Sequence, residues 1–353
     1  MIFRSLRYFF LLSISAGWVV AQTPESVLPP PIPDEPPILR AQPVREQEII
    51  TRLQIYLDQR NFGPGKIDGA WGEFTLKALR RYQKSIGQTV DGRWESITDL
   101  LQIEPIYTYY TLRAEDFKQL GSIPKTPKEQ SRLKRMPYTS ILEFLGEKFH
   151  SDPNFLLRLN KDRSMTGLKA GEVVRVPNVE PFLIESIRES GNLPEVPAFL
   201  TRSIHVDTVN KMLELREGET LLAAFPITPG SSAHPAPKGT WKIVGVVPLP
   251  WYRWNKGVLK KGVAEGVSYD IPNGPNCPVG VLWCGLNKRG VGIHGTNSPD
   301  TIGRSGSHGC IRLANWDAAR FMNMVTKGMV VKIDAEDSVP LEVTKPPALA
   351  PVL

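Results

Sequence analysis

The sequence predicts a multidomain α+β protein in which a helical N-terminal domain precedes a mainly β C-terminal domain. Apolar residues recur at helical spacing in residues 46–102, whereas short apolar runs of strand length fill residues 200–335. The 353 residues suffice for two or three domains of roughly 100–200 residues each. With 41% hydrophobic and 22% charged residues, the composition is that of a globular chain.

Residues 1–21 are typical of a secretory signal peptide. Arg4 and Arg7 precede a short apolar stretch, and Val19 and Ala21 supply the small residues of a cleavage site. The stretch is shorter than the ~20 residues that cross a bilayer, which argues against an uncleaved anchor. We therefore expect cleavage after Ala21, a periplasmic or cell-wall-associated protein, and membrane contact only during export.

Proline clusters in two further segments. Residues 22–45 predict an extended linker, and residues 336–353 predict a disordered tail. The formal net charge is +7, which suits an anionic envelope or nucleic acid, and equally a basic surface without a specific partner. Charge alone therefore does not select a partner.

Residues 46–102 are predicted to form the first folded domain. Two helical stretches flank a glycine-rich turn at residues 62–69, and the pair Asp91-Gly92 starts a further turn. A small helical bundle without a ligand would share this pattern. The segment also resembles the peptidoglycan-binding type-1 domain, which implies three helices and a groove for wall peptide or glycan. The matching residues are Leu53, Gln54, Gly63, Ile67, Asp68, Gly69, Gly72, Thr75, Ala78, Tyr82, Gln83, Gly87, Asp91 and Gly92.

Residues 103–179 are predicted to hold a connector and a second small module. Residues 103–137 are polar and basic, which indicates a connector or the entry to the next unit. A helical stretch over 141–149 and a short strand ending at Val176 indicate a fold after it. A plain linker domain is the alternative. The segment resembles a LysM module, a glycan-binding βααβ fold, through Leu159-Asn160, Gly171 and Val176-Pro177.

The chemistry-bearing residues lie near the end of the β domain, before an amphipathic helix predicted over Asp317–Val325. His294 and His308 each precede a glycine, and Cys310 follows Gly309. A nucleophilic cysteine needs an adjacent base, and a loop can return His294 to its side. Backbone amides around Gly309 could face an oxyanion, and the fork of Arg312 suits a carboxylate.

Two other interpretations of these residues stay open at this point. The two histidines and Cys310 could bind zinc with Cys284, although the spacing follows no common zinc motif. Cys310 could also be an inert core residue. The chain has three cysteines, so one is left over if Cys277 and Cys284 form a disulfide in an oxidising compartment.

The C-terminal domain resembles the L,D-transpeptidase (YkuD-type) catalytic domain, whose fold is β-sandwich-like. The resemblance implies that Cys310 attacks a stem-peptide carbonyl, that His294 takes its proton and that Gly295 orients His294 through its carbonyl. It implies no metal and no cofactor. It also implies pocket or oxyanion roles for Ser307, His308 and Gly309, and substrate contacts for Arg312, Thr296 and Trp283. The motifs are His294-Gly295-Thr296, Ile302-Gly303-Arg304 and Ser307-His308-Gly309-Cys310-Ile311-Arg312, flanked by Gly239, Pro278, Gly280 and Trp283.

The sequence departs from the usual family pattern in two places. Ala236 precedes Pro237 where threonine is common, and Cys277 is inserted beside Pro278.

We expect a peptidoglycan L,D-transpeptidase that uses a donor tetrapeptide, releases D-alanine and passes the acyl group to an amine of another stem or of an envelope lipoprotein. Nucleic acid is not an expected partner. A carboxypeptidase or amidase with the same thioester, and a non-catalytic wall-binding protein, are the alternatives.

Overall fold

The structure is a computed structural model that describes residues 46–97, 99–189, 191–231, 234–257, 263, 265–304 and 309–334. The signal peptide, the proline-rich linker and the C-terminal tail predicted from the sequence lie outside these residues. Among the helices that are described, none has the length and apolar character needed to cross a membrane.

Two α-helices, α1 (Glu46–Gln59) and α2 (Glu73–Ser85), build most of the N-terminal domain. Gln54 on α1 holds the glycine-rich turn between them, because its Oε1 accepts the backbone N–H of Gly69 at 3.0 Å. Gly69 has a φ of +69°, and a Cβ there would lie 2.6 Å from the Gln47 side chain. The turn therefore requires glycine for its conformation and for its contact with α1.

Two short 3-10 helices, η1 (Trp94–Ser96) and η2 (Leu100–Gln102), lie where the resemblance implies a third helix. Trp94, Ile97 and Leu100 are all buried. Their three-residue spacing matches the repeat of a 3-10 helix, in which side chains three apart lie above one another. The last element of the domain is thus a pair of short turns and not one α-helix.

The middle of the chain forms a small α+β module whose first strand lies in the segment predicted to be a connector. β1 pairs with β2 in an antiparallel two-stranded sheet, from Tyr107 opposite Pro177 to Thr111 opposite Val173. Of the two interpretations of this segment, the strand pairing supports the entry to the next unit and not a connector at these residues, and the run of tyrosine and threonine favours a strand. The elements are β1 (Tyr107–Thr111), α3 (Ala114–Phe117), α4 (Pro127–Gln130), α5 (Ile141–Lys148), α6 (Pro153–Leu159), β2 (Val173–Pro177) and η3 (Ile184–Ser186).

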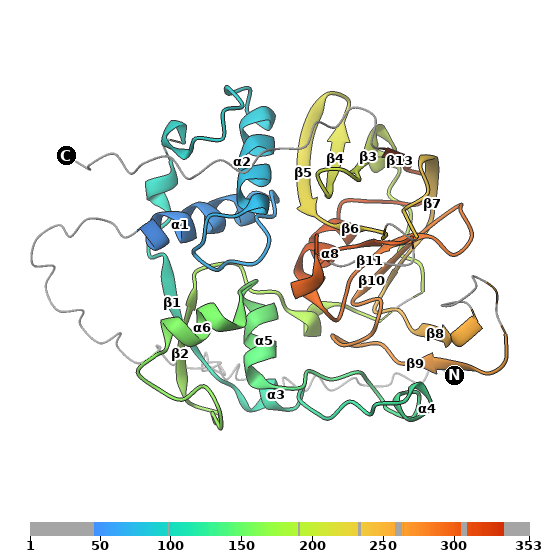
Figure 1. Ribbon diagram of the computed structural model, residues 1–353, viewed down its shortest axis with the longest axis horizontal. Helices are drawn as coiled ribbons and strands as arrows, with labels where there is room; N and C mark the ends of the chain where they lie inside the picture. The colour runs from blue at the N-terminus through green and yellow to red at the C-terminus, as the bar shows by residue number, and fades with distance from the viewer. Residues whose placement is uncertain are drawn as a thin grey trace, which may run out of the picture. The chain divides into compact units, whose positions relative to one another are not determined.

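A nine-stranded sheet dominates the C-terminal part of the chain, in the order β5-β4-β3-β13-β7-β10-β11-β12-β6 (Figure 1). The pairs β3–β13 and β11–β12 are parallel, and the other neighbours are antiparallel. The strands are β3 (Arg202–Asp207), β4 (Met212–Glu217), β5 (Thr220–Pro226), β6 (Thr228–Pro229), β7 (Gly239–Pro248), β10 (Leu282–Leu286), β11 (Gly292–His294), β12 (Ile311–Arg312) and β13 (Val330–Asp334).

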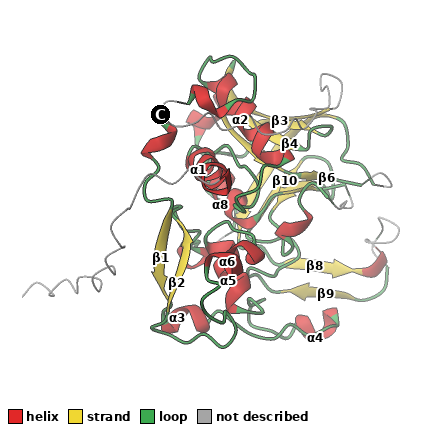
Figure 2. Cartoon of the chain, turned by 60° about the vertical axis from the view of Figure 1, so that its left-hand side comes forward, coloured by secondary structure: helices red, strands yellow, loops and turns green. Residues whose placement is uncertain are grey.

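The long strand β7 belongs to both halves of this sheet. It pairs with β13 through residues 239–242 and with β10 through residues 243–248. A separate hairpin, visible in Figure 2, joins β8 and β9. The remaining elements are β8 (Tyr252–Asn255), β9 (Ser268–Ile271), η4 (Pro197–Thr201), η5 (Pro299–Thr301) and α8 (Asn315–Met322).

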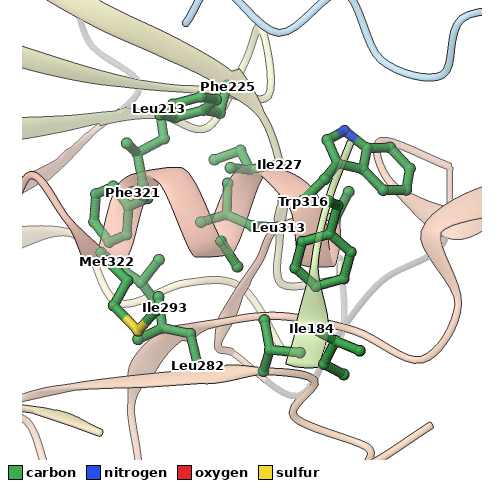
Figure 3. Close-up of a cluster of buried hydrophobic side chains, with 14 of the residues drawn as sticks. Ile184, Leu213, Phe225, Ile227, Leu282, Ile293, Leu313, Trp316, Phe321 and Met322 are labelled. Atoms are coloured by element: carbon green, nitrogen blue, oxygen red, sulfur yellow. The ribbon is translucent and has the colours of Figure 1, made fainter. Parts of the chain in front are cut away.

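Helix α8 packs its apolar face on the sheet, as its sequence pattern predicts. Phe321 and Met322 of α8 lie with Leu213 and Phe225 of the strands in one buried cluster (Figure 3). The helix ends at Met322, three residues before the predicted end. The same cluster includes Phe144 of α5, so the middle module and the β domain share a continuous core.

A buried polar cluster also joins three parts of the chain. Arg320 of α8 donates two hydrogen bonds to the carboxylate of Asp58 on α1, at 2.8 and 2.7 Å. His150, which follows α5, lies 3.1 Å from the same carboxylate. Burial alone would raise the pKa of Asp58, but Arg320 and His150 outweigh burial and hold it far below its usual range. The carboxylate is therefore ionised and paired inside the protein.

A second buried polar contact joins the N-terminal domain to the sheet. The Nε of Arg81 on α2 donates to Glu214 of β4 at 2.8 Å, and an Nη of Arg81 donates to Asp207 of β3 at 3.2 Å. All three side chains are buried. The N-terminal domain is consequently fixed to the β domain by ion pairs at two separate places.

Candidate active site

Two neighbouring strands bring the predicted histidine and cysteine together in the sheet. β11 ends at His294, and β12 starts directly after Cys310. The strands are parallel, with Ile293 opposite Ile311 and His294 opposite Arg312. Because both isoleucines are fully buried and side chains alternate along a strand, His294 and Arg312 project from the other face. The connecting loop thus returns Cys310 beside the strand that carries His294.

The imidazole of His294 is buried and held in one orientation. Its Nδ1 donates to the backbone carbonyl of Gly295 at 2.6 Å, which leaves Nε2 unprotonated in the neutral ring. The indole of Trp283, from the opposite position on β10, stacks on the imidazole with ring centroids 5.6 Å apart. The pKa of His294 is lowered to about 4, chiefly by burial and also by the charge of Arg312, against the hydrogen bond to Gly295. His294 is therefore a neutral base near pH 7.

Cys310 is half-buried at the start of β12. Its Sγ donates to the backbone carbonyl of Gly290 at 3.5 Å. Burial raises the pKa of the thiol, while the backbone amide of Gly292 and the charge of Arg312 act in the opposite direction. The resting thiol is thus protonated near neutral pH, and its reaction requires a base that accepts the proton.

Arg312 and Tyr252 complete the described surroundings of the sulfur. Arg312 is half-buried, and its Nε has no hydrogen-bond acceptor among the residues that the structure describes. Burial raises the pKa of Tyr252, as does the nearby thiolate form of Cys310, so the β8–β9 hairpin places this phenol at the site. Trp251, in contrast, is exposed and donates to Glu189 at 3.1 Å. Of these two aromatic residues, Tyr252 is the one whose pKa responds to the charge of Cys310.

Asn315, the first residue of α8, supports the loop after His294, and the sequence interpretation did not identify it. Its Oδ1 accepts the backbone N–H groups of Val281 and Thr296, both at 3.2 Å. Thr296 is buried and therefore contacts this support and not solvent. An asparagine near a helix start normally indicates a cap, so the local pattern did not distinguish this role.

The disulfide that the sequence left possible is not formed. Cys277 and Cys284 are both buried thiols, and they belong to different hydrophobic clusters. Cys284 lies in β10 at the centre of the sheet, while Cys277 donates to the carbonyl of Pro250 at 3.5 Å. Spacing along the chain made a bond conceivable, but the strand directs Cys284 into a separate core.

The predicted oxyanion segment is only partly described. Ser307 and His308 lie outside the described residues. Gly309 is buried with a φ of +95°, a conformation that favours glycine and lets the backbone turn sharply before Cys310. The backbone amide groups at Gly309 and Cys310 are therefore on a tight turn directly at the sulfur.

Comparison with known families agrees with this arrangement. The sequence model for the L,D-transpeptidase catalytic domain matches residues 201–333, which include β3 to β13 and the His294–Cys310 segment. Residues 201–333 are therefore an L,D-transpeptidase catalytic domain. Members of this domain family are cysteine-dependent acyltransferases. A second model, for a putative peptidoglycan-binding domain, matches residues 46–98 of the chain.

Several curated relatives carry related names. The putative L,D-transpeptidase YkuD of Bacillus licheniformis is 28% identical over 192 residues, which cover 54% of this chain and 92% of that protein. Its Bacillus subtilis namesake is 27% identical over 194 residues, covering 55% and 93%. Among solved structures, the catalytic domain of the Enterococcus faecium L,D-transpeptidase is 21% identical, covers 37% of this chain and 95% of that chain, and has a TM-score of 0.28.

Proposed function

We propose that this L,D-transpeptidase transfers an acyl group of peptidoglycan stem peptides through a thioester on Cys310, with His294 as the base. One observation carries the proposal. The Gly295 carbonyl accepts the Nδ1–H of His294 and so fixes the tautomer of the neutral ring. His294 ends β11, which pairs with β12, the strand that follows Cys310. The half-buried, protonated thiol needs such a base, and the ring's other nitrogen is available to serve as one.

The proposed reaction has two halves. In the first, Nε2 of His294 takes the thiol proton while Sγ of Cys310 attacks the carbonyl before the terminal D-alanine of a donor tetrapeptide. The carbon–nitrogen bond breaks, D-alanine leaves with the proton from His294, and a thioester remains. In the second, an acceptor amine attacks the thioester and gives a proton to His294. A new amide forms, and the proton returns to the sulfur.

The surrounding groups suit the charges that this reaction develops. Amides on the Gly309 turn are candidates for the donors to the oxyanion, together with the expected contributions of Ser307 and His308. The half-buried guanidinium of Arg312 suits a carboxyl group of the donor peptide. The indole of Trp283 keeps water from one face of the imidazole and thereby helps to keep it neutral.

We infer that the N-terminal domain holds the enzyme on its insoluble substrate. The match to a putative peptidoglycan-binding domain supports wall binding, and the β1–α5–α6–β2 module is a candidate LysM-like glycan-binding unit. Two weak binding modules would raise the effective concentration of peptidoglycan around the cleft. The signal sequence in residues 1–21 supports export to the periplasm or cell wall.

The acceptor can be identified from product masses. Incubating the mature protein with defined disaccharide-tetrapeptides should yield cross-linked dimers that have lost one D-alanine, because an amine resolves the thioester. A peptide bearing the lysine of an envelope lipoprotein, added as a competing acceptor, should be ligated only if protein anchoring is the reaction. Tripeptide as the sole product would instead assign a carboxypeptidase. Complete absence of turnover would favour a wall-binding protein without catalysis.

The pH dependence of the reaction follows from the lowered pKa of His294. With a pKa of about 4, the imidazole is an active neutral base above that pH and becomes protonated below it. The rate of Cys310 acylation by a carbapenem should therefore not show an acid limb near the ordinary histidine pKa of ~6.5. It should decline only as the pH approaches about 4. Stopped-flow measurement of the acylation rate across this pH range would locate the acid limb.

Trp283→Ala provides the comparison for this pH profile. The substitution uncovers one face of the imidazole, so the histidine pKa should rise and the acid limb should move to higher pH. A wild-type acid limb that already lies near ~6.5 would contradict the assignment of a buried neutral base.

A further inference from the structure

We infer that Glu147 of the middle module positions His294 for catalysis by acting through Asn315, so that this accessory module forms part of the support of the active site. The inference deepens the proposed function and rests on His294 being the base. Glu147 and Asn315 are positioning residues, since neither contacts the reacting atoms.

The first step is the connection between Asn315 and the histidine. Its Oδ1 accepts the N–H of Thr296, the residue next to Gly295, and also the N–H of Val281 on the neighbouring segment. The Gly295 carbonyl in turn holds Nδ1 of His294 at 2.6 Å. A movement of Asn315 would therefore move the peptide that sets the ring orientation.

The second step is the tight fit of this connection. A Cβ at Gly295 would lie 2.4 Å from Oδ1 of Asn315, and a Cβ at Gly280 would lie 2.1 Å from the same atom. Both distances are below any normal contact, so these two backbone segments approach the amide as closely as glycine permits. The side-chain amide of Asn315 therefore has no room to rotate toward another hydrogen-bond partner on the side of Gly280 and Gly295.

The third step is the link to the middle module. Nδ2 of Asn315 donates to Oε1 of Glu147 on α5 at 2.9 Å and to the carbonyl of Pro275 at 3.1 Å. The hydroxyl of Tyr138 donates to the same Oε1 at 3.2 Å. Tyr138, Glu147 and Asn315 are all buried. Glu147 is thus the side chain outside the catalytic domain that fixes which way the amide of Asn315 faces.

The electrostatic state of Glu147 suits this role. The pKa of Glu147 is raised to about 8, chiefly by burial and also by electrostatic repulsion from Glu143, against the hydrogen bonds from Asn315 and Tyr138. The group is therefore a neutral acid near pH 7, and glutamine reproduces its shape and its acceptor oxygen. Leucine has a similar size but no acceptor, so Glu147→Leu removes the hydrogen bond while it keeps most of the packing.

The test uses the full mature chain and the rate of Cys310 acylation by a carbapenem. Glu147→Leu should lower the saturating rate ~10-fold or more, because a misplaced base loses its alignment, while the half-saturation concentration stays close to wild type. The acid limb of the pH–rate profile should also shift. Glu147→Gln should restore most of the rate and the wild-type profile. Asn315→Ala, a second variant, should lose at least as much rate as Glu147→Leu.

Glu143→Gln is the matched control. Glu143 lies one turn away on the same helix and accepts a hydrogen bond from Asn276 of the catalytic domain at 2.6 Å, but neither residue bonds to the peptide after His294. The Glu143→Gln variant should be acylated by the carbapenem at a rate near that of the wild type. A folded Glu147→Leu or Asn315→Ala variant that reacts at the wild-type rate with an unchanged profile would overturn the inference. If Cys310→Ala and His294→Ala also formed the adduct normally, the proposed function itself would fail instead.

Discussion

The Cys310→Ala variant should form no acyl-enzyme and no cross-linked product. Alanine removes the sulfur that forms the thioester, and no other side chain on this face of β12 can replace it in the proposed reaction. We expect turnover of defined tetrapeptides to drop by at least ~10³-fold, with the fold retained, since the thiol is only half-buried. Mass spectrometry after exposure to a carbapenem should find no adduct on the variant.

His294→Ala should give a comparable defect for a different reason. The protonated thiol of Cys310 would lose the base that accepts its proton, which costs ~10²–10⁴-fold. Because the residues act as a unit, the double variant should be little worse than either single one. A residual rate that rises steeply toward alkaline pH would be consistent with direct ionisation of the thiol.

Cys277→Ala is the control for both variants. Burial raises the pKa of Cys277 to about 12, so this thiol is protonated and unreactive at neutral pH. The variant should form the carbapenem adduct and cross-link peptides at rates near wild type. Loss of the adduct in Cys277→Ala together with its survival in Cys310→Ala would reassign the nucleophile.

The second large effect is expected on stability, from the cluster of Asp58, His150 and Arg320. Arg320→Ala should lower the free energy of unfolding by ~3–5 kcal/mol, because it leaves the fully buried Asp58 carboxylate without its bidentate partner. Urea unfolding of the purified chain near pH 7 would measure the loss. The N-terminal helices should become sensitive to proteolysis first, since Arg320 holds α1 against α8.

An exposed ion pair in the same domain provides the comparison. Lys327 and Glu195 lie 2.9 Å apart, but both side chains are more than half exposed. Lys327→Ala should therefore cost only ~0–1 kcal/mol. Replacing both Asp58 and Arg320 with leucine should recover much of the lost stability, because no unpaired charge would remain buried. An Arg320→Ala variant as stable as Lys327→Ala would contradict the assigned importance of this cluster.

Local sequence pattern was sufficient for several strands of the large sheet and for the reactive segment. The short apolar runs predicted as strands within residues 200–335 are confirmed, among others, in β3, β5 and β7. Each of these strands is marked by apolar residues within a few positions of one another. The hydrogen bond between His294 and Gly295 also involves adjacent residues. The motif around Cys310 could therefore be recognised without knowledge of any distant contact.

The tertiary structure alone decided the features that join distant segments. Tyr107–Thr111 is a strand because Val173–Pro177 pairs with it, and Cys284 is kept from Cys277 because β10 lies at the centre of the sheet. The hydrogen bond from Asn315 to Glu147 spans 168 residues, and the pair Arg320–Asp58 spans 262.

The physical reason for this division is the range over which each feature acts. Periodicity and turn chemistry are determined by neighbours along the chain, so the sequence by itself determined the strands, the helix α8 and the His294–Cys310 segment. The energy of a buried polar side chain depends on partners brought close only by folding. Only the tertiary structure could therefore decide that Asp58, Glu147 and Asn315 connect the accessory modules to the catalytic domain.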